Sequence, residues 1–128
     1  MTIINPPSLI SPRGYSHGVL AQGRTLFVAG QIGWNANGEI VSDHCGDQFD
    51  QALANVLAVV REAGGAPESL ARLTIYVVDK REYIEEQREI GEKYRARMGR
   101  HYPAMTLVEV TSLLEPQARV EIEATAVI

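Results

Sequence analysis

The sequence predicts an α+β fold, in which a single mixed β-sheet carries two helices packed on one face, in the order β-β-α-β-α-β-β. Two observations lead to this prediction. Short segments alternate apolar and polar residues, as strands do, and two longer segments repeat apolar residues at helical spacing. The 128 residues contain no repeat or low-complexity run, so we expect one domain over residues 1–128.

The composition argues against several kinds of partner. The formal net charge of −4 at pH 7 disfavours a nucleic-acid interface, because such interfaces use Lys and Arg to neutralise phosphates. No apolar run reaches the ~20 residues of a membrane span and the N-terminus lacks a signal peptide, so we expect a cytoplasmic protein with no membrane partner. The single cysteine, Cys45, excludes an internal disulfide and a cysteine zinc site, and no metal is expected.

The N-terminal part is predicted to form an extended arm followed by a β-hairpin. Three prolines before Gly14 favour the extended arm. Residues 15–21 and 25–30 have strand character on either side of a turn at residues 22–24, which is the local pattern of a hairpin. Residues 30–38 are rich in Gly and Asn, a composition typical of a loop.

A helix and a buried strand are predicted next. From Asp47 the apolar residues follow the helical repeat, and Gly64-Gly65 provides a C-terminal end. The apolar stripe consists of Phe49, Ala52, Leu53, Val56, Leu57 and Val60. Residues 70–78 are apolar and β-branched, which favours a strand buried on both faces.

A second helix is predicted to follow this strand. Asp79 and Glu82 have the spacing of a capping box, in which Asp79 accepts from the N3 amide and Glu82 reaches back. The helix is expected to end near Gly99. Its stripe consists of Tyr83, Ile84, Gln87, Ile90, Tyr94 and Met98.

Two closing strands are predicted at residues 102–110 and 119–128, as a pair joined by a turn at residues 113–116. The second strand alternates aliphatic residues with charged ones, so one of its faces is apolar. Two helices cover only one face of the sheet, and we expect the other face to be buried in a homo-oligomer. The residues expected on that other face include Met105, Leu107, Arg119, Glu121 and Val127.

Segments spread along the chain resemble the RidA/YjgF family in order and spacing. They are Tyr15-Ser16, residues 27–33, Gln48 with Asn55, residues 63–65, Tyr102-Pro103-Ala104 and residues 120–127. The resemblance implies a chorismate-mutase-like protomer, assembled as a homotrimer with three sites between its subunits. It also implies hydrolysis of small, reactive imines or enamines to 2-keto acids and ammonia, with no cofactor.

The sequence departs from the family at one position of the implied site. Relatives carry an arginine directly after Pro-Ala, whose guanidinium grips the substrate carboxylate. This chain has Met105 there, and a thioether cannot hold an anion. Gln87 stands where many relatives have an asparagine, and it keeps an amide. The sequence therefore resembles a branch of the family that lacks the arginine and has an altered substrate preference.

The resemblance assigns the site glutamate of the family to Glu121. Hydrolysis of a C=N bond needs a group that positions water and accepts its proton, and a carboxylate suits this role. A solvated glutamate on a strand is the alternative. Glu123 lies ~6.6 Å further along the same strand face, where a salt bridge or a surface charge is its favoured interpretation.

Other candidates come from the N-terminal half. Tyr15 either contacts the substrate or packs in the core, and His17 is either an acid–base group or an exposed histidine. Gly30 and Gln31 belong to a glycine-containing segment that can present backbone amides to a ligand. Trp34 lines either the pocket mouth or the oligomer interface.

The remaining candidates are three arginines, a cysteine and a histidine. Arg13, Arg24 and Arg119 are candidates to replace the missing arginine, although an ion pair of Arg119 with a strand glutamate is the alternative. Cys45 precedes the first helix, where it is either a stabilised thiolate or an ordinary residue at the start of the helix. His101 is expected on a loop surface.

Three hypotheses for function follow. The first is a RidA-like hydrolytic deaminase that acts on an enamine or imine and releases ammonia. The second is a non-catalytic homotrimer that binds a metabolite or a protein. The third, disfavoured by the acidic composition, is a ribonuclease or translation inhibitor.

Overall fold

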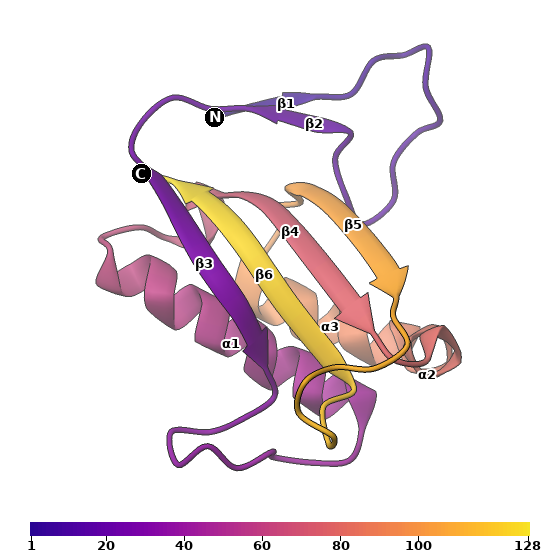
Figure 1. The fold of residues 1–128 in the computed structure, drawn as a ribbon. Helices are drawn as coiled ribbons and strands as arrows, with labels where there is room; N and C mark the ends of the chain where they lie inside the picture. The colour runs from indigo at the N-terminus through magenta and orange to yellow at the C-terminus, as the bar shows by residue number, and fades with distance from the viewer.

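A computed structural model describes all residues, 1–128, and its central feature is a four-stranded mixed sheet (Figure 1). The strand order is β3-β6-β4-β5. These strands span Thr25–Ile32 (β3), Val120–Val127 (β6), Leu70–Val77 (β4) and Ala104–Glu109 (β5). β6 pairs antiparallel with both β3 and β4, whereas β5 pairs parallel with β4. The α+β class and the mixed sheet are thus confirmed.

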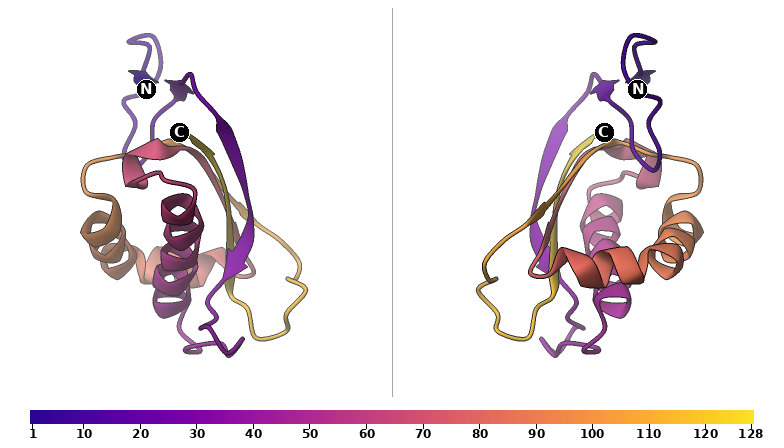
Figure 2. Two further views of the ribbon diagram at one scale, coloured as in Figure 1. Left: turned by 90° about the vertical axis from the view of Figure 1, so that its left-hand side faces the viewer. Right: turned by 90° about the vertical axis from the view of Figure 1, so that its right-hand side faces the viewer.

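All helices lie on one side of this sheet, as the two edge views of Figure 2 show. They are α1 (Cys45–Glu62), α2 (Lys80–Glu85) and α3 (Gln87–Met98), with a short 3₁₀ helix at Pro67–Ser69. The predicted second helix is therefore two helices, because the chain leaves the helical conformation at Glu86. None of the helices combines the length and the apolar character needed to cross a bilayer.

The core lies between α1, α3 and the covered face of the sheet. The whole predicted stripe of α1 is buried there, which confirms the helical periodicity. β4 buries Leu73, Ile75 and Val77 on this side, whereas Thr74 and Tyr76 on its other face remain accessible. The prediction that this strand is buried on both faces is therefore wrong for the single chain.

The predicted N-terminal hairpin is also wrong. β2 (Gly18–Leu20) pairs antiparallel with β1 (Thr2–Ile4) in a separate two-stranded sheet, and β3 pairs with β6. The physical reason is the longer ladder that β3 gains. Its eight residues find a partner in β6, which is also eight residues long, whereas β2 has only three.

The start of α2 differs from the predicted capping box. Asp79 is the N-cap, but its side chain accepts from the amide of Arg81, the second residue of the helix. The carboxylate of Glu82 does not reach back to the cap, because it forms an ion pair with Arg119.

The two closing strands are not neighbours, since β4 lies between them (Figure 1). Met105 is in register with the buried Leu73, and both Met105 and Leu107 pack against the core on the helix side. Glu121 is in register with Tyr76 on the open face. The prediction that Met105 and Leu107 share the open face with Glu121 is therefore wrong, because alternation within a strand does not reveal which face meets the helices.

Candidate functional site

A cavity of about 320 Å³ lies between the β5 edge of the sheet and the α2–α3 helices. Buried apolar side chains from α1, β4 and α3 form its floor. These are Phe49, Ile75, Ile90 and Tyr94. The half-buried Met105 forms a wall, and the exposed Gln87 lies at the opening. Two predicted site residues, Met105 and Gln87, thus meet in this cavity.

Four aromatic rings line the same cavity. Phe49 and Tyr83 meet edge to face with ring centroids 6.3 Å apart, and Tyr94 stacks on Tyr102 at 5.2 Å. Burial raises the pKa of both Tyr83 and Tyr94, so their hydroxyls stay protonated at neutral pH. The cavity is therefore an aromatic pocket with neutral phenols.

The hydroxyl of Tyr94 is already committed to the loop before β5. It donates to the carbonyl of His101 at 2.7 Å, and His101 Nε2 lies 2.7 Å from the carbonyl oxygen of Leu70. The prediction that His101 lies on a loop surface is wrong, since it is half-buried and joins α3 to β4. These contacts hold Tyr94, which lines the cavity, against the loop before β5.

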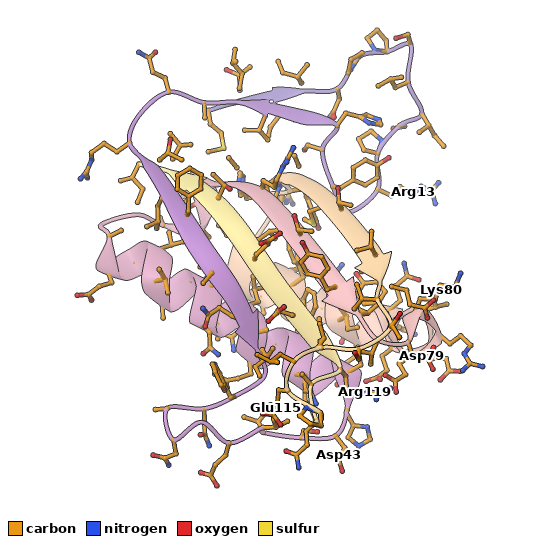
Figure 3. All side chains as sticks on the ribbon, viewed as in Figure 1. Arg13, Asp43, Asp79, Lys80, Glu115 and Arg119 are labelled. Carbon is orange, nitrogen blue, oxygen red and sulfur yellow. The ribbon has the colours of Figure 1, made fainter.

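Two arginines line the cavity, and one of them was not among the predicted residues. Arg13, a candidate replacement for the missing arginine, reaches it from the N-terminal loop (Figure 3). Arg95 reaches it from α3 and was missed. The sequence did hold a signal, because Gln87, Gly91 and Arg95 follow at intervals of four and so share one helix face. Arg24 does not line the cavity.

Glu121 lies on the opposite face of the sheet, over Gly30. β3 has a bulge between Val28 and Gln31, and a Cβ atom placed on Gly30 would come within 2.8 Å of the Glu121 Cδ atom. Gly30 therefore makes room for the carboxyl group. The half-buried Glu121 carboxylate makes no hydrogen bond or ion pair with the rest of the chain.

Glu123, further along β6, has a partner of a different kind. The Tyr76 hydroxyl donates to Glu123 Oε1 at 2.6 Å, and this bond raises the pKa of Tyr76. Glu123 is exposed and forms no salt bridge, so the surface-charge interpretation holds for it. The two glutamates of β6 thus differ in that only Glu121 is without a partner.

Arg119 does not pair with either glutamate of its own strand. It forms a two-pronged ion pair with Glu82 of α2, with Nε and Nη2 at 3.0 and 2.8 Å from the carboxylate oxygens. Its amide donates to Oε1 of the fully buried Gln48 at 2.7 Å. Figure 3 places Arg119 at the end of the sheet away from Arg13, so it does not reach the cavity.

Tyr15 and His17 lie on the N-terminal loop and do not line the cavity. Their rings meet edge to face, with centroids 5.3 Å apart. His17 Nε2 lies 2.7 Å from the Ile10 carbonyl oxygen, and the His17 amide donates to Asn5 Oδ1 at 2.8 Å. Both contacts stay within the loop.

The segment from Gly30 to Trp34 is held in place by α1. Asn55 Nδ2 donates to the carbonyls of Ile32 and Trp34 at 3.1 and 3.0 Å. Gln31 donates to the Ala29 carbonyl within its own strand. Trp34 is 41% exposed and lies outside the cavity.

Cys45 begins α1 and is buried. Burial, with smaller effects from Glu86 and Glu82, raises the pKa of the thiol to about 12. The residue is therefore an un-ionised packing residue at the start of the helix. His44 at the N-cap makes no side-chain cap; instead Glu86 accepts from the Gly46 amide at 3.0 Å.

No group of three or more His, Cys, Asp or Glu side chains is arranged to hold a metal ion. The chemistry that the chain itself offers thus consists of an aromatic cavity with two arginines and, on the other face, an unpaired glutamate.

The fold and sequence are similar to those of known proteins. A family model described as Endoribonuclease L-PSP matches residues 7–128. A RutC family protein of Pyrococcus horikoshii is 36% identical over 95% of this chain and 91% of its own length. A human protein named 2-iminobutanoate/2-iminopropanoate deaminase is 30% identical over 94% of this chain and 83% of its own.

Solved structures agree with these matches. The Rid family protein YyfB of Yersinia pestis, described as of unknown function, superposes with a TM-score of 0.88 and 36% identity over 99% of this chain and 98% of its own. The family match thus spans nearly the whole chain. The chain belongs to the RidA/YjgF family, whose family model bears the description Endoribonuclease L-PSP.

Proposed function

We propose that this protein is a hydrolytic deaminase, which converts a reactive imine or enamine into a carbonyl compound and ammonia. The observation that carries the proposal is the carboxylate of Glu121, which lies half-buried over Gly30 without a partner and is free to bind water. The human relative named as an imine deaminase supports the same reaction class.

The proposed site needs two copies of the chain. Met105 and Gln87 line the cavity on the helix side, whereas Glu121 projects from the open face of the same sheet. One ligand can touch both groups only if Glu121 comes from a neighbouring copy. The open face favours such packing because it carries Phe27, whose side chain is 79% exposed. A homotrimer with sites between its subunits is the assembly we propose.

The chemistry requires proton transfers that a carboxylate can perform. An enamine first gains a proton at carbon and becomes an iminium ion, which is the protonated imine. Water then attacks the C=N carbon while Glu121 accepts one of the water protons, and this gives a carbinolamine. Glu121 passes that proton to the nitrogen, the C–N bond breaks with release of ammonia, and the hydroxyl loses its proton to the solvent as the carbonyl forms. Oxidation states do not change, so no redox partner is needed.

The test generates imines in place with an amino-acid oxidase and follows formation of the keto acid with and without the protein. Glu121→Gln should lower kcat at least ~100-fold, the loss expected for a general base. Glu123→Gln is the matched control, because it removes a charge from the same strand face. Light scattering checks that each variant keeps the assembly. An unaccelerated reaction with every imine, or equal rates in the two variants, would refute the proposal.

One observation favours a second function, that of a non-catalytic metabolite-binding oligomer. Met105 lines the cavity with a thioether that cannot bind an anion, at a position where the family resemblance implies an arginine, so the cavity can bind a ligand without turning it over. Saturable ligand binding without acceleration of any imine would select this alternative. A ribonuclease is disfavoured by the net charge of −4.

A further inference from the structure

The cavity beside Met105 has an unbalanced charge. Its lining contains Arg13 and Arg95 and no carboxylate. Neither arginine forms a salt bridge, although Arg81, Arg97 and Arg119 all do. Both arginines are exposed at the opening, above a floor of buried apolar side chains. The opening can therefore hold an anion, whereas the floor cannot.

The two arginines reach the cavity from different elements, Arg13 from the N-terminal loop and Arg95 from α3. Arg13 precedes Ser16, whose amide donates to the Pro103 carbonyl at 3.0 Å and so fixes the N-terminal loop against the start of β5. Arg95 lies over Gly91, where a Cβ atom would come within 3.2 Å of Arg95 Nη1. Each guanidinium is thus carried by an element that packs beside the cavity.

The floor suits a large apolar group. Four aromatic rings and Met105 surround a volume of about 320 Å³, which falls in the range of small-molecule pockets. A short chain of two to four carbons would leave most of these walls without contact. An aromatic ring would pack against them with favourable offset or edge-to-face geometry.

We infer that this cavity binds an aromatic carboxylate, with Arg13 and Arg95 holding the carboxylate at the opening and the ring seated against Met105. Combined with the proposed function, on which this step rests, the substrate class is the 2-imino acid of an aromatic amino acid. Met105 then acts as the ring contact, and Arg13 and Arg95 recognise the anion.

Direct binding tests the inference without requiring turnover. Calorimetry is run with 3-phenylpropanoate, its uncharged analogue 3-phenylpropanamide, and butanoate. We expect the aromatic acid to bind at least ~10-fold more tightly than the amide or the short acid, because a charge-assisted hydrogen bond contributes about 1.5–3 kcal/mol. Arg13→Gln and Arg95→Gln should each lower the affinity for 3-phenylpropanoate ~10-fold or more and leave the affinity for the amide unchanged.

The matched control is Arg88→Gln, which removes an exposed charge from α3 outside the cavity. Met105→Ala should lower the affinity for both aromatic ligands and leave the affinity for butanoate unchanged. Equal affinity for acid and amide would overturn the inference, as would Gln variants that bind like the unmodified protein. The inference would also be overturned if Arg88→Gln lost as much affinity for 3-phenylpropanoate as the Arg13 and Arg95 variants, since that result indicates non-specific electrostatic attraction.

Kinetics separate this inference from the proposed function. If the binding pattern holds and no imine is turned over, the proposed deaminase fails and the aromatic anion site stands. If 2-iminobutanoate is hydrolysed faster than the imine of phenylalanine and neither Gln variant changes the rates, the deaminase stands and the aromatic site fails.

Discussion

Replacing Gly33 by alanine should destabilise the protein strongly, because there is no room for a Cβ atom. The added atom would lie 2.6 Å from the Gln48 Cα atom and 2.7 Å from its Cβ. Carbon atoms pack at about 3.5–4.0 Å, so α1 would have to move by roughly 1 Å. Such overpacking costs about 1–3 kcal/mol.

The movement would also disturb the hydrogen bonds of Gln48. Its side chain donates to the carbonyls of Ser42 and Gln117 at 2.8 and 3.0 Å and accepts from the Arg119 amide. Weakening these bonds lowers the free energy of unfolding by about 1 kcal/mol more. Alanine also lowers the conformational entropy of the unfolded chain, which raises the free energy of unfolding by about 0.4–1 kcal/mol. We expect a net loss of about 1–3.6 kcal/mol.

Urea unfolding at one fixed protomer concentration measures this loss, because self-association would otherwise shift the apparent stability. Gly30→Ala is the matched control, since the three atoms nearest to its Cβ atom would all belong to the flexible Glu121 side chain and not to the backbone. If the free energies of unfolding of Gly33→Ala and Gly30→Ala differ by less than about 0.5 kcal/mol, the reasoning is refuted.

Three further predictions concern Gly30, Cys45 and the Arg119–Glu82 pair. Gly30→Ala should cost less than about 1 kcal/mol but lower kcat by displacing the Glu121 carboxyl, and an unchanged kcat would contradict the role given to that contact. The pKa of Cys45 is raised to about 12 in the folded protein, so its contribution to stability is complete below about pH 9 and is lost as the pH rises toward 12. Relative to Cys45→Ala, the free energy of unfolding should fall by about 1.4 kcal/mol per pH unit in that window, and parallel pH profiles would exclude this. A double-mutant cycle of Arg119→Gln and Glu82→Gln should give a coupling of about 0.5–1 kcal/mol, because the two side chains are 34% and 33% exposed; no coupling would mean that the ion pair contributes nothing.

Local patterns predicted the elements well and their partners poorly. The helical repeat from Phe49 to Val60 identified α1, because one buried stripe is enough to reveal a helix. The Gln22-Gly23-Arg24 turn suggested a hairpin, yet the ladder between β3 and β6 joins residues about a hundred positions apart. No local signal reports such pairing.

Of the residues predicted for the site, Met105 and Gln87 line one cavity, and the geometry of that cavity was not predicted. Alternation correctly separated the charged and apolar faces of β6, but it could not show that Met105 lies on the helix side of the sheet. The partner of Arg119 was missed because Glu82 is 37 positions away, on a helix that packs only in the folded chain. Arg95 was overlooked because a charged residue on a helix is ordinarily solvated.

The contact between Glu86 and Gly46 has a consequence for how the chain folds. The first turn of α1 receives its carboxylate from a residue 40 positions later, at the junction of α2 and α3. A peptide containing α1 alone would therefore fray at its N-terminus. Hydrogen exchange at the Gly46 amide should be slow only once α2 and α3 have docked, so this amide reports on the completion of the helical layer.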